Sequence, residues 1–195
     1  MGYSQAQKAE SRVKVLEAAA QKIRENGIEA LGVADCMRSA GLTHGAFYGH
    51  FESRDALIIE ALEHAVELGN KRIDALANNA RNRSKTPLQG IVESYLGEAH
   101  VANPGNGCAL CALAGEARHA NAATKAVLTR HVHSLALRLA EAAGGSTEAE
   151  GLGITATIIG AITLARAVDD AALARSILSN SIALVLSQDR NQKAA

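Results

Sequence analysis

Apolar residues recur at three- and four-residue spacing along most of this sequence, and the strict alternation of apolar and polar residues that marks strands is nearly absent. Alanine, leucine and charged residues dominate, and the only two prolines, Pro87 and Pro104, fall at junctions between helical segments. The pattern predicts an all-α fold of about nine helices. With 195 residues, 48% of them hydrophobic, the chain is long enough to bury a core in one or two domains.

The first 60 residues contain three short helical segments separated by clear stop signals. An amphipathic helix is predicted to end at Asn26-Gly27, and a short second helix over residues 33–40 is closed by Gly41. Thr43 can cap a third helix that runs to about residue 51, and Ser53 caps a long fourth helix over about residues 53–80. Two short helices joined by a tight glycine turn match a helix-turn-helix, whose second short helix enters the DNA major groove.

Three of the five aromatic residues, Phe47, Tyr48 and Phe51, lie within the predicted recognition helix. Phe47 and Phe51 are four residues apart and share one helix face, so we expect both to pack the helix onto its neighbours. Packing in the core of a small bundle explains these two residues without any contact to DNA. Tyr48 carries a phenol that can bond a phosphate, and the small residues before Phe47 allow a close approach to base edges.

The segment from Ala40 to Leu57, AGLTHGAFYGHFESRDAL, resembles the signature of TetR/AcrR-type transcriptional regulators. The resemblance implies an N-terminal helix-turn-helix domain over residues 1–60 and a helical effector-binding and dimerisation domain over residues 61–195, connected by helix four. It also implies base readout by Thr43, His44, Gly45 and Ala46, and contacts to the DNA backbone by Tyr48, His50 and Arg54. Arg54, like Arg12, could equally be a solvated surface charge.

The charge balance limits how such a domain would hold DNA. The net charge of the chain is zero, and residues 1–60 carry seven Lys or Arg against eight Asp or Glu. We therefore expect a few placed contacts and weak non-specific affinity. The second helix begins at Gly32-Val33, where these regulators often present a threonine that touches phosphate, so that contact is not expected here.

The cysteines and the hydrophobic segments bear on the compartment. Three cysteines are an odd number, and the charged N-terminal segment lacks the apolar core of a signal peptide, so we expect a reducing cytoplasm. The longest uncharged stretch, residues 151–165, falls short of the roughly 20 residues that span a bilayer. It predicts a buried helix and no membrane contact.

Three further helices are expected over about 86–102, 108–120 and 122–143, and by resemblance they enclose an effector pocket. The segment from Gly107 to Arg118 resembles a motif found in one branch of these regulators, which includes electrophile-responsive members. Cys108 lies at a predicted helix start, where the helix dipole lowers the pKa of a thiol, and Cys111 is one turn away as a resolving partner. The alternative is that Cys108 and Cys111 are two small buried residues without a redox role. The predicted effector or redox residues are Cys108, Cys111, His100 and Tyr95.

A metal site is not expected, because Cys108, Cys111, His100 and His119 fit no known zinc spacing. No cofactor is predicted either, and His131 and His133 are expected on a helix surface. The sequence contains no phosphate loop, paired catalytic carboxylates or nucleophile elbow, so we expect no enzyme. A small helical thiol-redox or metal-binding protein without a role on DNA remains the alternative function.

A recognition helix this short reads few base pairs, which favours a homodimer on two half-sites of a double-stranded operator. A capping box at Thr147–Glu150 opens helix eight, and Asp169-Asp170 can cap helix nine. Resemblance to a family that dimerises through its last two helices favours these over intrachain packing alone. The predicted interface residues are Gly153, Ala156, Gly160, Ile177, Ser181 and Val185. We expect a repressor that a small-molecule effector or electrophile releases from DNA.

Overall fold

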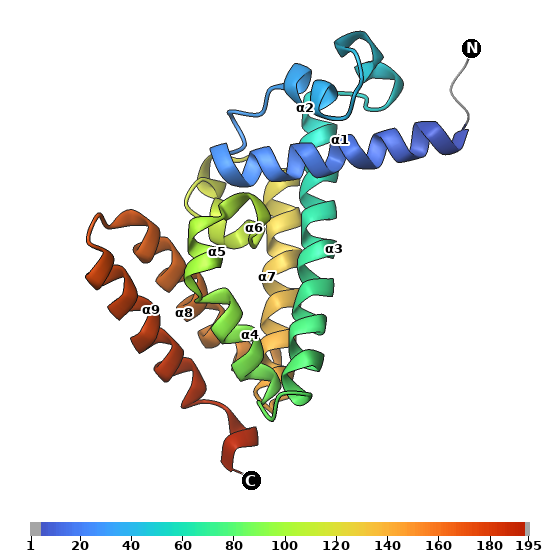
Figure 1. Ribbon diagram of the computed structural model, residues 1–195. Helices are drawn as coiled ribbons and strands as arrows, with labels where there is room; N and C mark the ends of the chain where they lie inside the picture. Colours follow the sequence, from blue (N-terminus) through green and yellow to red (C-terminus); the bar gives the residue numbers. More distant parts are fainter. Residues whose placement is uncertain (1–4, 194–195) are drawn as a thin grey trace.

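The computed structural model describes residues 5–193, which form nine α-helices and four short 3-10 segments without a strand in that range (Figure 1). The all-α prediction is confirmed. The α-helices are α1 (Gln5–Asn26), α2 (Val33–Ser39), α3 (Arg54–Arg81), α4 (Pro87–Tyr95), α5 (Glu98–Ala102), α6 (Ala109–Leu113), α7 (Ala122–Ala142), α8 (Glu148–Ala167) and α9 (Ala171–Leu186). The 3-10 segments are η1 (His44–Gly49), η2 (Pro104–Asn106), η3 (Ala117–His119) and η4 (Arg190–Lys193).

The N-terminal helices begin and end close to the predicted residues. α1 ends at Asn26 and is followed by Gly27, whose φ of 87° is a left-handed conformation that favours glycine. The Ser53 hydroxyl accepts a hydrogen bond from the amide of Ala56 at 3.0 Å and so caps α3. The predicted third helix is instead the 3-10 segment η1, and Thr43 makes no side-chain cap. Gly45 and Gly49 explain the difference, because two glycines in six residues lower the α-helix propensity.

Two hydrophobic cores share the short helix α6. Cys108, Leu110 and Cys111 pack in the C-terminal core, whereas Ala109 and Leu113 pack in the N-terminal core with the helix-turn-helix. α1 lies across α3 and α7, which run side by side down the molecule (Figure 1). The N-terminal core therefore extends beyond residue 60 and reaches into the predicted effector domain.

Two predicted helices are shorter than expected. The segment over 86–102 is broken at Leu96-Gly97 into α4 and α5. The segment over 108–120 is α-helical only over Ala109–Leu113, Gly115 lies in the turn that follows, and Ala117–His119 forms the 3-10 segment η3. Glycine in a helix interior is costly in conformational entropy, which accounts for both breaks.

α7 and α8 approach each other closely at Gly151. A Cβ atom at this position would lie 1.8 Å from the carbonyl oxygen of Ala136 on α7. α8 has the length and apolar composition of a membrane-spanning helix, and in this fold it packs between α7 and α9 with seven of its residues buried. The predicted buried helix is thus present, and it belongs to the C-terminal core.

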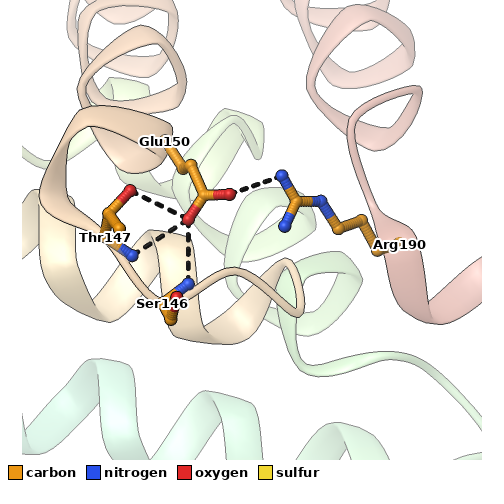
Figure 2. A network of polar contacts seen from close by, with 4 residues as sticks. All are labelled: Ser146, Thr147, Glu150 and Arg190. Atoms are coloured by element: carbon orange, nitrogen blue, oxygen red, sulfur yellow. Dashed lines mark hydrogen bonds and ion pairs between the residues drawn. The ribbon is translucent and has the colours of Figure 1, made fainter.

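A polar network holds the start of α8 to the chain that follows α9 (Figure 2). The Glu150 carboxylate accepts hydrogen bonds at 2.9 Å from the amides of Ser146 and Thr147 and from the Thr147 hydroxyl, and it pairs with Arg190. These bonds hold the pKa of Glu150 at about 2. The network fixes α8 relative to α9.

Candidate DNA-reading and effector sites

The segment over residues 44–51, which contains η1, presents one aromatic side chain and buries two. Phe47 and Phe51 are each 3% exposed, and their rings stack with centroids 5.8 Å apart. Tyr48 is 78% exposed, and its ring meets the edge of Phe47 at a centroid distance of 5.2 Å. The expected packing role of the two phenylalanines is confirmed, and the Tyr48 phenol is free to meet a ligand outside the chain.

The start of η1 is open to an approaching surface. His44 is exposed, and a Cβ added at Gly45 or Gly49 would meet no atom of the chain within 4 Å. Packing within the chain therefore does not require a glycine at either position. A groove of about 270 Å³ runs beside these glycines, and its lining residues are Lys8, Ser11, Leu42, Gly45, Ala46, Gly49 and His50.

Lys8 and Ser11 on α1 were not predicted as site residues, although they place a cation and a hydroxyl beside the recognition segment. His50 also faces this groove, and its buried Nδ1 atom has no hydrogen-bond partner. Burial, with the positive charges of Lys8 and Arg12, lowers the pKa of His50. Its ring is therefore neutral at pH 7 in the unbound protein.

Two arginines near η1 hold the domain together. The Arg54 guanidinium donates hydrogen bonds to the carbonyl oxygens of Ile28 and Glu29, both at 2.9 Å, and of Leu31 at 3.2 Å. Arg12 stacks over the Phe51 ring at 4.8 Å and pairs with Glu60. The structure thus gives Arg54 a positioning role in the turn between α1 and α2, and its contact with phosphate stays a prediction.

The predicted effector residues lie together around a chain of hydrogen bonds. Nδ1 of His100 donates to the carbonyl oxygen of Tyr95 at 2.7 Å, and Nε2 accepts from the amide of Cys108 at 3.1 Å. With both nitrogens engaged in this way, His100 is a neutral imidazole, in agreement with the lowering of its pKa by burial. The ring centroids of His100 and Tyr95 are 5.0 Å apart.

The two thiols differ in their environment. The Sγ atom of Cys108 lies 3.5 Å from Nε2 of His131. Hydrogen bonding from Cys111, followed by that from His131, lowers the pKa of Cys108 well below its ordinary value, and the same bond with burial raises the pKa of Cys111. Cys108 is therefore the thiol that ionises first. Both residues are free cysteines and both are buried.

The prediction for His131 was wrong, because this residue is 1% exposed and lies inside the C-terminal core region. Its position on α7 follows the buried stripe of Val127, Leu128 and Leu135, and that spacing could have revealed it. His119, in contrast, is exposed and accepts a hydrogen bond from Arg118. Over the part of the chain that the structure describes, no three His, Cys, Asp or Glu side chains gather into a metal-binding group.

A cavity of about 150 Å³ opens beside Cys108 at the junction of α1, α3 and the loop before α6. Arg24 and Arg72 line it, and sequence reasoning identified neither. Nε of Arg24 donates to the carbonyl oxygen of Gly105 at 2.7 Å, and Arg72 donates to that of Asn106 at 2.9 Å. The lining residues are Arg24, Ala65, Leu68, Gly69, Arg72, Tyr95, His100, Asn106, Gly107 and Cys108.

The outer face of α8 and α9 is apolar and uncovered in the single chain. Gly153 and Ala156 are exposed, and Gly160, Ile177 and Ser181 are half-buried. The prediction for Val185 was wrong, because this side chain is fully buried in the C-terminal core and cannot reach a second chain. Four exposed leucines on this face were missed, at 41–56% exposure: Leu152, Leu164, Leu173 and Leu184.

Comparisons with known proteins agree with this arrangement. Residues 15–61 match the family model described as bacterial regulatory proteins, tetR family. A 45-residue segment is 40% identical to the uncharacterized HTH-type transcriptional regulator YvdT of Bacillus subtilis (strain 168), and this match spans 23% of each chain.

Solved structures extend the likeness to nearly the whole chain. The reduced form of NemR from E. coli superposes with a TM-score of 0.73 at 18% identity, covering 90% of this chain and 95% of that one. A TetR-family regulator from Cytophaga hutchinsonii gives a TM-score of 0.75 at 18% identity, covering 97% and 99%. Together with the helix-turn-helix, these matches show that residues 15–61 form a tetR-family DNA-binding domain, in a chain whose fold is that of the solved TetR-family regulators.

Proposed function

We propose that this TetR-family transcriptional regulator binds a palindromic DNA operator as a homodimer and reads base edges with residues 43–46. TetR-family regulators are not enzymes, and as a family they bind DNA as dimers and respond to small-molecule effectors. The observation that carries the proposal is the segment over residues 44–51, in which the buried Phe47 and Phe51 fix an exposed Tyr48 and an open start at His44 and Gly45. Tyr48 and His50 would bond backbone phosphates, with Lys8 adding a cation.

A mobility-shift assay on the promoter region of its own operon tests the reading segment. Tyr48→Phe removes one phosphate hydrogen bond and should weaken operator binding about tenfold, since a bond to a charged group is worth roughly 1.5 kcal/mol. His44→Ala should relax sequence preference at one base pair. Leu137→Ala on α7, far from η1 in the fold, is the matched control and should bind as the wild type does. Unchanged specific binding in both reading-segment variants would remove η1 as the reading head.

The dimer would form through the apolar face of α8 and α9. The exposed leucines and the small residues Gly153 and Ala156 favour this face, because close helix approach needs small side chains and an uncovered apolar surface of this kind marks an interaction site. A palindromic operator then follows from the two-fold symmetry of the dimer.

Release from DNA would follow from a ligand, or from an electrophile that modifies Cys108. The low pKa of Cys108 beside His131 and its place on the cavity wall favour the second route. An electrophile that accepts the thiolate forms an S–C bond at Cys108 and enlarges a residue at the junction of the two cores. Cys108→Ser should keep operator binding and lose release by N-ethylmaleimide, whereas Cys36→Ala, which removes the buried thiol of α2 in the helix-turn-helix, should keep both. Full release in Cys108→Ser would refute release through Cys108 but would leave the DNA-binding proposal unaffected.

A further inference from the structure

The cavity beside Cys108 contains two guanidinium groups and no carboxylate. Arg24 and Arg72 both line it, and none of its ten lining residues is Asp or Glu. Within the described part of the chain neither guanidinium forms an ion pair, and the one bond that each donates goes to a backbone carbonyl. A guanidinium presents five N–H donors, so both groups keep donors for a further acceptor.

The remaining wall is suited to a small hydrocarbon group. Ala65, Leu68 and the buried Tyr95 supply apolar surface, and His100 adds no charge because both of its ring nitrogens are already hydrogen-bonded within the chain. A cavity of about 150 Å³ is large enough for roughly six heavy atoms, the size of benzene. The cavity thus combines two cations at one part of its wall with a short apolar region.

We propose that this cavity binds a small organic monocarboxylate, whose carboxylate is held by Arg24 and Arg72 and whose short alkyl group packs on Leu68 and Tyr95. A planar carboxylate matches the fork of a guanidinium and replaces the water that otherwise solvates it. A neutral ligand of the same shape leaves the cations without a partner, and a cationic ligand is repelled.

The site lies next to α1, which connects it to the DNA-reading segment η1. Arg24 belongs to α1, which carries the helix-turn-helix, whereas Arg72 belongs to α3, and the loop at Gly105-Asn106 lies between them. A carboxylate that accepts hydrogen bonds from Arg24 competes with the bond that Arg24 donates to the carbonyl of Gly105. Loss of that bond shifts α1 relative to the loop. This regulatory consequence rests on the proposed function, whereas the binding itself does not.

Isothermal titration of the full-length protein with butyrate and with butyramide tests the site, because the two probes share shape and size and differ in charge. We expect butyrate to bind and butyramide to bind at least tenfold more weakly. Arg72→Gln should raise the Kd for butyrate at least tenfold, since Arg72 is exposed and its removal leaves the core intact. Lys71→Gln, the same change of charge at the adjacent exposed position, should alter the Kd less than twofold.

Equal binding of the two probes, an unchanged Kd in Arg72→Gln, or no butyrate binding up to about 50 mM would each overturn the proposal. Arg24→Gln provides an independent second variant, and circular dichroism of both variants confirms that they are folded. Operator binding is measured separately without butyrate, so a failure of the DNA-binding proposal and a failure of the carboxylate site give different results.

Discussion

The Glu116 carboxylate, in the turn after α6, accepts a hydrogen bond from the backbone amide of Ile28 at 3.3 Å. Ile28 follows Gly27 at the end of α1, and a Cβ added at Gly27 would lie 2.6 Å from the same carboxylate. The thiol-bearing helix α6 is therefore tied to the turn that leads into the helix-turn-helix. The contact supplies a second link, besides Arg24, between the effector region and the reading head.

Glu116→Ala should reduce the release of DNA by an effector while leaving the free energy of unfolding nearly unchanged. Glu116 is exposed, so we expect the free energy of unfolding to fall by less than about 1 kcal/mol. Operator affinity without effector should stay within a few-fold, while the fraction of DNA released by N-ethylmaleimide falls. Arg118→Ala changes an exposed neighbour and serves as control. A full release response in Glu116→Ala would show that the signal takes another path.

Gly151→Ala and Gly153→Ala form a matched pair on α8. At Gly151 the added methyl group meets the carbonyl of Ala136, so we expect a loss of about 2–3 kcal/mol in the free energy of unfolding. At Gly153 it meets no atom of the same chain, and the gain in helix propensity predicts a slightly more stable monomer. Urea denaturation of both variants in the Leu164→Glu background, which is expected to be monomeric, checks the difference, and equal stability would contradict the close approach of α7 and α8.

Leu164→Glu and Leu184→Glu should convert the dimer to a monomer. These side chains are 56% and 55% exposed in the single chain, so a charge there costs the fold little but places two desolvated carboxylates in a symmetric interface. Light scattering after size exclusion measures the mass, and affinity for a palindromic site should fall at least tenfold. Leu137→Glu, on α7 at 40% exposure, is the control, and a dimeric Leu164→Glu protein would place the interface elsewhere.

Glu150 should make the stability of the protein depend on pH below neutrality. Its pKa falls from 4.5 to about 2 on folding, so its contribution is complete above pH 4.5 and is lost as the pH drops toward 2. Glu150→Gln should lower the Tm at pH 7 and narrow the gap to the wild type as the pH falls through this window. Thermal melts at a series of pH values test it, and a gap that is constant with pH would contradict the role of this carboxylate.

Local signals predicted where most helices begin and end, because capping is decided by neighbouring residues. Ser53 and Asp170 cap α3 and α9 through side-chain bonds to nearby amides, as their positions suggested. The thiol site was predicted only in part. Tyr95, His100 and the two cysteines lie together as expected, but His131 was assigned to a surface although its spacing follows the buried stripe of α7.

Other features depend on contacts between distant segments and leave no local trace in the sequence. Arg24 and Arg72 are 48 positions apart and look like ordinary surface cations until the fold brings them to one cavity. In the sequence Arg54 resembles a phosphate ligand at a helix start. In the structure its guanidinium donates hydrogen bonds to three carbonyl oxygens of the turn between α1 and α2. Val185 continues an apolar helix face, and only the packing of α9 shows which side of that helix is covered.

Because α1 is long and uninterrupted, a small tilt near the cavity becomes a larger displacement at its other end. Arg24 is near one end of this helix and Lys8, which lines the groove beside η1, is 16 residues away. At 1.5 Å per residue the two side chains are anchored about 24 Å apart along the axis of a stiff rod. If the loss of the Arg24 bond to Gly105 tilts α1 by about 5°, the backbone at Lys8 moves by about 2 Å relative to that at Arg24, enough to break a hydrogen bond to a phosphate. On the proposed function, a ligand of a few atoms would therefore act on bound DNA by tilting α1.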